Sequence, residues 1–225
     1  MAGIESGRRH TRDDVARTAL RILDDHGLPD LTMRRLAAAL DVQASALYWH
    51  FPNKQSLLAE LADRIVAGPE RVTGPERVAG PEGVADPVAG SGEWTDAVRA
   101  EALALRDALL AYRDGAEVVA STLALGLGSR TALDRLTAAV ALGGFDEPTA
   151  RRGATALLHF VLGHVSHEQQ RLQYDSIGVL ADPADPADAG ARAGDASAAD
   201  FAFGADVFVG GLERLRSGEV SPLRT

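Results

Sequence analysis

The sequence predicts an all-α protein. Outside a few stretches rich in Gly and Pro, apolar residues recur every three or four positions, the spacing of a helix with one buried face. Hydroxyl residues and acids precede several of these segments, as helix starts require, and no segment shows the apolar-polar alternation of a strand. With 225 residues and 46% hydrophobic residues, the chain has enough apolar material for a buried core.

The first 66 residues contain four helical segments. Thr11 precedes a helix expected from about 12 to 26, which Gly27 and Pro29 end. Thr32 precedes a second helix that stops at Asp41, residues 43–50 form a short third one, and a fourth runs to residue 66. A helix of about nine residues, a tight turn and a second short helix is the helix-turn-helix arrangement.

The third segment decides between a DNA-binding head and an ordinary small helical bundle. A bundle would make this segment apolar throughout, yet its side chains are mostly polar or amphipathic, and only Leu47 and Ala44 are expected to pack inward. The polar members are Gln43, Ser45, Tyr48 and His50. We therefore expect an exposed recognition surface around the stretch LYWHFPNK, residues 47–54.

Composition narrows the class of protein. The net charge is −9, but residues 1–54 hold eight basic and seven acidic residues, so the negative charge lies in the remainder. This asymmetry allows the N-terminal end to approach phosphates. The chain has no cysteine, which excludes disulfides and thiolate catalysis, and no apolar run suggests a signal peptide or membrane span. We expect a cytoplasmic protein.

The helical pattern resumes at Glu93. Helices are expected over 93–113, 116–125, 132–142 and 147–173, and a last one near the C-terminus. The repeat GPERVT, GPERVA, GPEGVA at 68–85 cannot form a continuous helix, and Ala181 to Asp200 is expected to be a mobile connection. We therefore divide the chain into a head (1–66), a linker (67–92) and a C-terminal domain (93–225).

Two C-terminal segments carry apolar seams with a spacing of four and three. The first runs through Ala154, Leu158, Val161, Val165, Glu168 and Leu172, and the second through Phe201, Ala205, Phe208, Leu212 and Leu215. Two such helices per chain can form a four-helix bundle across a two-fold axis, with Leu158, Val161, Val165, Phe201, Phe208 and Leu212 in the interface of a homodimer. Alternatively, both seams pack within one subunit.

Together, these segments resemble the tetracycline-repressor (TetR) family. The head resembles it in LTMRRLAAALDVQASALYWHFPNKQSLL, and the C-terminal half resembles the tetracycline repressors themselves in ALLAYRDGAEVV, HFVLGHVSHEQQ and FGADVFVGGLERL. The resemblance covers about four-fifths of the chain. It implies a homodimeric repressor that binds a palindromic double-stranded DNA operator and leaves it when a small-molecule inducer binds the C-terminal domain.

The resemblance also implies which head residues bind DNA. Arg34 lies at the family's position for a guanine contact, where its two forked donors match the O6 and N7 acceptors. Gln43 and Ser45 can reach base edges or phosphates, while Thr32, Tyr48, His50 and Lys54 match positions that hold the DNA backbone. Trp49 either packs under the phosphates or buttresses the helix, and we favour the second role.

The ligand side departs from the tetracycline repressors. Where they have a magnesium-site histidine and a drug-binding histidine, this chain has Val119 and Glu70, and His167 and Glu101 replace a glutamate and an asparagine. The matching positions that remain are Leu105, Thr122, Leu133, Leu136 and His159. We therefore expect no cofactor and no resident metal, and an antibiotic-like or polyketide-like inducer that controls an efflux or biosynthetic gene. A magnesium-tetracycline-responsive repressor of a resistance pump is the alternative.

A helical metalloenzyme is the rival class. His164 and His167 are three residues apart on one helix and could share an ion, but His159 lies about 12 Å along the axis from His167, which is too far. The order His-x-x-His-Glu is not the metalloprotease motif, and no third ligand is evident. We therefore expect no catalysis, and histidines that line a pocket or the dimer seam.

Overall fold

The structure is a computed structural model that describes residues 10–68, 92–128, 130–176 and 186–218. Residues 69–85 of the repeat, most of the predicted linker and Glu70 lie outside the described residues. The described chain is helical and contains no strand, as predicted. Its helices are α1 (Arg12–His26), α2 (Met33–Ala39), α3 (Ala44–Leu47), α4 (Lys54–Ala67), α5 (Glu93–Leu110), α6 (Gly115–Ala124), α7 (Thr131–Ala141), α8 (Glu147–Ser176) and α9 (Pro186–Arg216).

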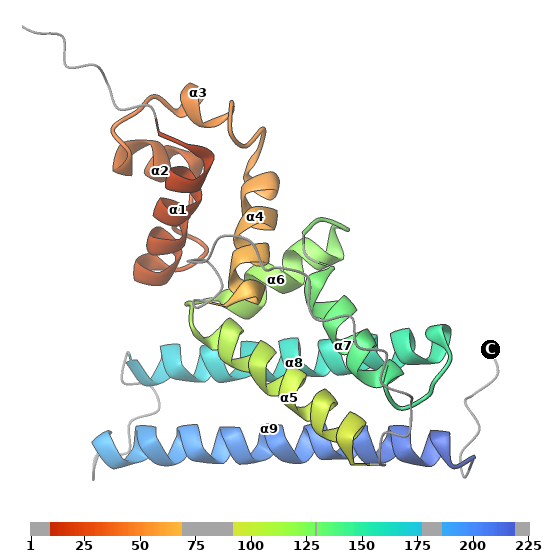
Figure 1. Ribbon diagram of the computed structural model, residues 1–225. Coiled ribbons are helices and arrows are strands. Elements are labelled where there is room, and N and C mark those ends of the chain that lie inside the picture. Colours follow the sequence, from red (N-terminus) through yellow and green to blue (C-terminus); the bar gives the residue numbers. More distant parts are fainter. Residues whose placement is uncertain (1–9, 69–91, 129, 177–185, 219–225) are drawn as a thin grey trace, which may run out of the picture.

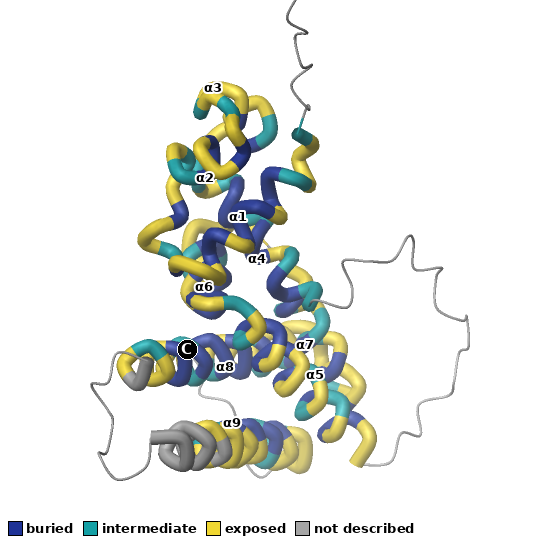
Figure 2. The backbone as a smooth tube through the Cα atoms, turned by 90° about the vertical axis from the view of Figure 1, so that its left-hand side faces the viewer, coloured by how far each residue is buried: buried dark blue, intermediate teal, exposed yellow. Residues whose placement is uncertain are grey.

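The molecule has a small head above a larger helical body (Figure 1). Helices α1 to α4 form the head, with α3 at its outer end, and α4 descends to contact α6, α5 and α7 of the body. In the body, α8 and α9 lie side by side at the base, and α5 and α7 cover α8. Figure 2 shows that the buried residues continue from the head through α4 into the body.

The head has its own apolar interior because each helix contributes one apolar face. Val15 and Leu23 of α1, Leu36 of α2 and Leu61 of α4 are fully buried. Across the head surface, Arg12 and Arg64 both bond to the carboxylate of Glu60, at 2.9 Å each, which links the start of α1 to α4. Arg12 also donates to the carbonyl oxygen of His50, at 3.3 Å, so it links the start of α1 to the segment that follows α3.

A capping box starts α1. The Thr11 hydroxyl oxygen accepts a hydrogen bond from the Asp14 backbone N–H, and the Thr11 backbone N–H donates to the Asp14 carboxylate. The Thr11 backbone and hydroxyl, together with Arg17, lower the pKa of Asp14 from 3.8 to about 2. Because this pKa falls on folding, ionised Asp14 stabilises the head above about pH 4, and the contribution is lost as the pH drops toward 2.

Replacing Thr11 tests this cap. Thr11→Ala should lower the free energy of unfolding by about 1 kcal/mol, because one N–H of the first turn loses its acceptor. Thr11→Ser keeps the hydroxyl and should stay close to the parent protein. Urea denaturation followed by circular dichroism measures both variants, and equal midpoints for alanine and serine would show that the cap contributes nothing.

Aromatic side chains pack against one another at two places in the body. Trp94, near the start of α5, is 1% exposed and meets the ring of Phe145 edge-on, with the ring centroids 5.6 Å apart. On α8 and α9, Phe160 stacks against Phe201 at 5.5 Å. These aromatic contacts hold the base of the body together.

One predicted element is wrong. Ala181 to Asp200 was expected to be a mobile connection, but residues 186–200 form the first half of α9. Pro186 occupies the first helical position, where its fixed φ and missing N–H are tolerated, and the alanines that follow have the highest helix propensity. Alanine therefore outweighs the glycines and aspartates of this segment.

Candidate DNA interface and ligand pocket

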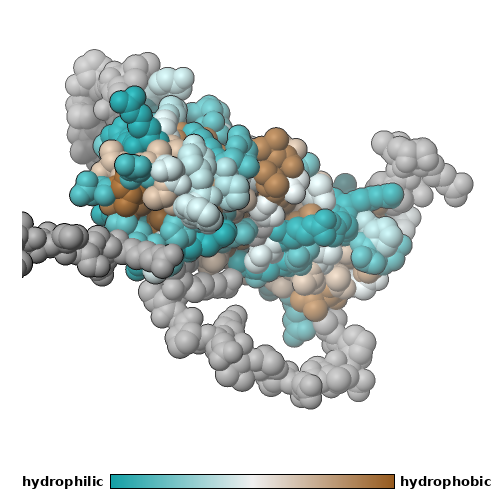
Figure 3. Space-filling view, turned by 90° about the horizontal axis from the view of Figure 1, so that it is seen from above, coloured by the Kyte–Doolittle hydropathy of each residue, from teal (hydrophilic) through white to brown (hydrophobic). Residues whose placement is uncertain are grey.

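The outer end of the head carries the predicted DNA-binding side chains. Thr32 and Arg34 lie at the start of α2, Gln43 is the residue before α3, and all three are exposed. Helices α2 and α3 pack against each other, and Asp41, with φ 53°, makes the turn between them. Figure 3 looks down on this end and shows mostly hydrophilic and neutral residues with separate apolar patches.

The remaining predicted DNA contacts follow on α3 and the start of α4. Ser45 and Tyr48 are exposed, and His50 and Lys54 are half-buried. Leu47 and Phe51 are buried at 2% and 0% exposure, so they anchor this segment from below. The short helix therefore presents polar groups outward on an apolar foundation, as the sequence predicted for Leu47.

Trp49 does not buttress the helix. Its side chain is 90% exposed, whereas Leu47 and Phe51 supply the packing beneath α3. The favoured interpretation of Trp49 is therefore wrong, and the other one, that the ring lies toward the phosphates, remains.

Two basic side chains at the outer end of the head have no acidic partner in the described part of the chain. Within the described residues, neither Arg34 nor Lys54 has a carboxylate within salt-bridge distance, whereas the neighbouring Arg35 pairs with Asp30 at 2.8 Å. The Thr32 hydroxyl oxygen accepts from the Arg35 backbone N–H at 3.1 Å and so caps α2. Arg34 and Lys54 can therefore bind base edges or phosphates without first breaking an ion pair.

The predicted ligand-binding residues divide into two groups. Leu105, Val119, Thr122 and Leu136 are buried in the body, with at most 3% exposure, and Leu133 packs against the same core. In contrast, His159 and His167 are exposed on α8 and do not join this cluster. Helices α5, α6 and α7 therefore bring the apolar part of the predicted pocket together without the two histidines.

The polar groups of this cluster are already bonded. Thr122 donates within its own helix, to the carbonyl oxygens of Val118 and Val119, and Glu101 forms an ion pair with Arg135 of α7. Glu101 therefore links α5 to α7 rather than standing free for a ligand. A molecule that enters this core meets mainly apolar side chains.

The predicted dimer residues lie mostly inside the single chain. Val161, Val165 and Phe201 are 0% exposed, Leu158 is 3% and Leu212 is 6% exposed, and Phe208 is half-buried. The packing of both seams within one subunit, which the spacing also allowed, therefore accounts for their burial. Leu172, the last residue of the first seam, is 54% exposed, and two other apolar residues of α9 are exposed as well, Phe203 at 72% and Val207 at 58%.

The histidines of α8 form no metal cluster. The His164 ring packs against Phe201 and its Nε2 lies 3.1 Å from the Ser197 carbonyl oxygen, while His167 is exposed. In the part of the chain that the structure describes, no group of three or more His, Asp or Glu side chains could hold a metal ion. His164 therefore helps to join α8 to α9.

Comparison with known proteins assigns both parts of the chain to families. Residues 16–61 match the family described as "Bacterial regulatory proteins, tetR family", and residues 86–216 match "Tetracyclin repressor-like, C-terminal domain". The chain belongs to the TetR family. The expected family and fold class are confirmed, and the family is one of transcription regulators rather than enzymes.

Individual relatives agree with this assignment. The chain is 34% identical to the class C tetracycline repressor of Escherichia coli, over 70% of this chain and 66% of the repressor. It is 31% identical to the class G repressor of Vibrio anguillarum, over 90% of this chain and 93% of the repressor. A crystal structure of BioQ with its double-stranded DNA operator has a TM-score of 0.66 and 33% identity, over 90% of this chain and 98% of BioQ.

Two features of this TetR-family chain escaped sequence reasoning. Arg106 of α5 and Glu168 of α8 form a buried ion pair at 2.7 Å, and Asp114 joins Leu28, just after α1, to α8. Glu168 gave a signal, because it is the charged member of an otherwise apolar seam. Asp114 gave none, since its backbone N–H partner, Leu28, is 86 residues away along the chain.

None of the described helices of the chain is both long and apolar enough to span a bilayer.

Proposed function

We propose that the chain is a ligand-responsive transcriptional repressor that binds a palindromic operator as a homodimer and is released by a small-molecule inducer. The carrying observation is the exposed face of Thr32, Arg34, Gln43, Ser45 and Tyr48, held on the buried anchors beneath α3. A DNA-binding role accounts for this polar face, for the unpaired arginine and for the exposed tryptophan together. Such a regulator acts in the cytoplasm, where bacterial DNA lies.

The homodimer is proposed to use the exposed face of α8 and α9. Leu172, Phe203 and Val207 leave apolar surface open on the two helices that lie at the base of the body. A second copy that covers this face through a two-fold axis would bury it and form a four-helix bundle. The same axis would direct two α3 helices toward successive major grooves, about 34 Å apart.

The inducer is proposed to enter the apolar cluster of α5, α6 and α7. Its lining favours a bulky, largely apolar molecule, antibiotic-like or polyketide-like, over a magnesium-tetracycline chelate. Val119 is a buried hydrocarbon where the tetracycline repressors hold magnesium through a histidine, and Glu101 is paired with Arg135. Because magnesium requires polar ligands, an apolar cluster without them lacks the anchor of the chelate.

Operator binding should depend steeply on salt. We expect the protein to retard a palindromic fragment from its own promoter region, and its affinity to fall by about 10³-fold between about 50 and 200 mM salt, as six or more phosphate contacts from two heads require. Band-shift titrations at several salt concentrations measure this. An affinity that is flat with salt would contradict phosphate binding by this face.

The inducer class is tested on the same complex. A bulky polyketide that binds the body should raise the melting temperature of the free protein and release the DNA fragment at the same concentrations. Tetracycline should do neither, with or without magnesium. Magnesium-dependent stabilisation by micromolar tetracycline would instead establish the alternative, a tetracycline-responsive repressor.

A further inference from the structure

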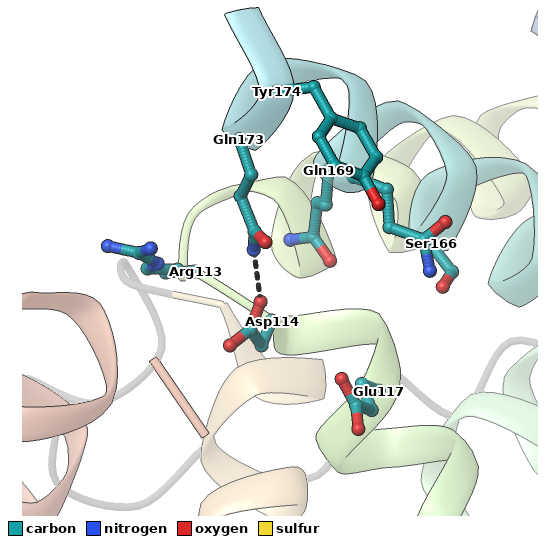
Figure 4. A pocket seen from close by; sticks show the side chains of 8 residues that line it. Arg113, Asp114, Glu117, Ser166, Gln169, Gln173 and Tyr174 are labelled. Atoms are coloured by element: carbon teal, nitrogen blue, oxygen red, sulfur yellow. Dashed lines mark hydrogen bonds between the residues drawn. The ribbon is translucent and has the colours of Figure 1, made fainter. Parts of the chain in front are cut away.

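A polar cavity of about 440 Å³ lies between the first turn of α6 and the C-terminal part of α8 (Figure 4). It is separate from the apolar cluster around Leu105 and Leu136, and none of the residues predicted for ligand binding lines it. We propose that this cavity is a second ligand site, for a small hydroxyl-rich cation such as an amino sugar, and that its occupancy is transmitted to the head through Asp114.

Several lining side chains are available to a ligand. Glu117 of α6 and Ser166, Gln170 and Tyr174 of α8 have no hydrogen-bond or ion-pair partner among the described residues. Together they offer a carboxylate, a carboxamide and two hydroxyls, and the Tyr174 side chain is 53% exposed, so its ring can cover one face of a sugar. Hydroxyl groups of a ligand can therefore be bonded from two helices at once.

The charge of the cavity selects a cation. Asp114, the residue before α6, and Glu117, in the first turn of α6, both line the cavity. Arg113 is the only cation of the lining, and its guanidinium extends away from Glu117 and Ser166 (Figure 4). An ammonium group beside Glu117 would gain a charge-assisted hydrogen bond, whereas an anion would face two carboxylates.

One residue of the cavity wall, Gln169, is held in place by hydrogen bonds to the backbone. Gln169 is 7% exposed and uses its amide on the backbone around the start of α6. Its Nε2 donates to the Tyr112 carbonyl oxygen at 2.8 Å and to the Leu109 carbonyl oxygen at 3.0 Å, and its Oε1 accepts from the Ala116 N–H at 3.3 Å. Gln169 therefore supports the structure of the wall. The side chains left to contact a ligand are the neighbouring ones without partners among the described residues.

The same wall joins the body to the head. Asp114, 8% exposed and held at φ 56°, accepts a hydrogen bond from the Leu28 N–H at 2.8 Å and another from the Gln173 amide of α8. The Arg113 N–H also donates to the Asp24 carboxylate of α1, at 3.2 Å. A cation in the cavity would compete for the Asp114 carboxylate and so change the contact that positions the end of α1.

Binding is tested without DNA, by calorimetry of the full chain with glucosamine and with glucose as its uncharged counterpart. We expect glucosamine to bind at millimolar concentrations and glucose to bind at least tenfold more weakly. Glu117→Gln should weaken glucosamine by about tenfold, because the hydrogen bond to the ammonium loses its negative partner. Glu93→Gln, at an exposed acid in the first turn of α5, is the matched control and should bind as the parent does. No glucosamine binding, or equal binding by the Glu117 variant, would overturn the site.

The effect of ligand binding on the head rests on the proposed function, and it is measured separately as a change in operator affinity. Glucosamine should shift the operator affinity of the parent protein at least threefold, and should leave that of Glu117→Gln unchanged. If glucosamine binds in calorimetry while operator affinity stays constant, the site stands and its coupling to the head is refuted. If the protein retards no operator fragment at all, the proposed function fails, while the calorimetric result still decides the site.

Discussion

Arg34→Ala should weaken operator binding by at least about tenfold, because each head loses a two-donor contact worth about 1 to 3 kcal/mol, at 1.4 kcal/mol per tenfold change. Arg34 is exposed at the start of α2, without an ion-pair partner among the described residues, so its guanidinium is not committed elsewhere. If the contact is to a guanine, the variant should also lose preference at that base pair. Band shifts with the operator and with a fragment altered at each guanine in turn measure both effects.

Arg35→Ala is the matched control. It removes the same charge from the next position of the same helix, but the Arg35 guanidinium pairs with Asp30. Its affinity loss should be small and equal for all fragments, since only long-range attraction to phosphates changes. Should both alanine variants lose affinity equally and keep the base preference, Arg34 would be a phosphate contact rather than a base reader.

The head was predictable because its signals are local. Thr11 and Thr32 each accept a hydrogen bond from a backbone N–H of the helix that they precede, so both predicted caps are true N-caps. The first helix begins and ends where its cap and Gly27 indicated. A cap and an apolar stripe act within a few residues, so the sequence contains all that is needed to place such helices.

Apart from the first half of α9, where alanine propensity decided, the errors occurred where side-chain packing decides. The orientation of Trp49 depends on which of three neighbouring side chains fills the space beneath α3, and Leu47 and Phe51 fill it. Likewise, spacing identifies the seams of α8 and α9 but cannot say whether a seam faces its own subunit or a partner. Only the folded chain distinguishes the buried Val161 from the exposed Phe203.

The sequence predicted the apolar residues of the candidate ligand sites but not their polar contacts, for the same reason. Apolar positions such as Leu105 and Leu136 are buried as expected, but the ion pair that occupies Glu101 connects two helices whose contact no local pattern encodes. The polar cavity beside Asp114 likewise exists only because the turn between α5 and α6, the start of α6 and the end of α8 meet.

Glu168→Ala should destabilise the body by about 3 to 5 kcal/mol, because it leaves the Arg106 guanidinium buried without its counter-charge. The two side chains are 11% and 10% exposed and 2.7 Å apart, and Arg106 also lies over the Phe201 ring, 5.5 Å from its centroid. Asp107→Ala is the matched control: it removes a carboxylate 3.7 Å from the same arginine, but one that is 74% exposed, so its effect should stay below about 1 kcal/mol. Urea denaturation at one fixed protein concentration compares the variants.

The double variant Arg106→Met with Glu168→Leu separates the value of the pair from the cost of breaking it. Arg106 Nε and Glu168 Oε2 are buried without a hydrogen-bond partner, so the pair does not recover the full cost of its desolvation. Two apolar side chains of similar size avoid that cost, and the double variant should be at least as stable as the parent protein. If it is instead as unstable as Glu168→Ala, the ion pair is itself a main source of stability, and the packing of α5 and α9 on α8 depends on it.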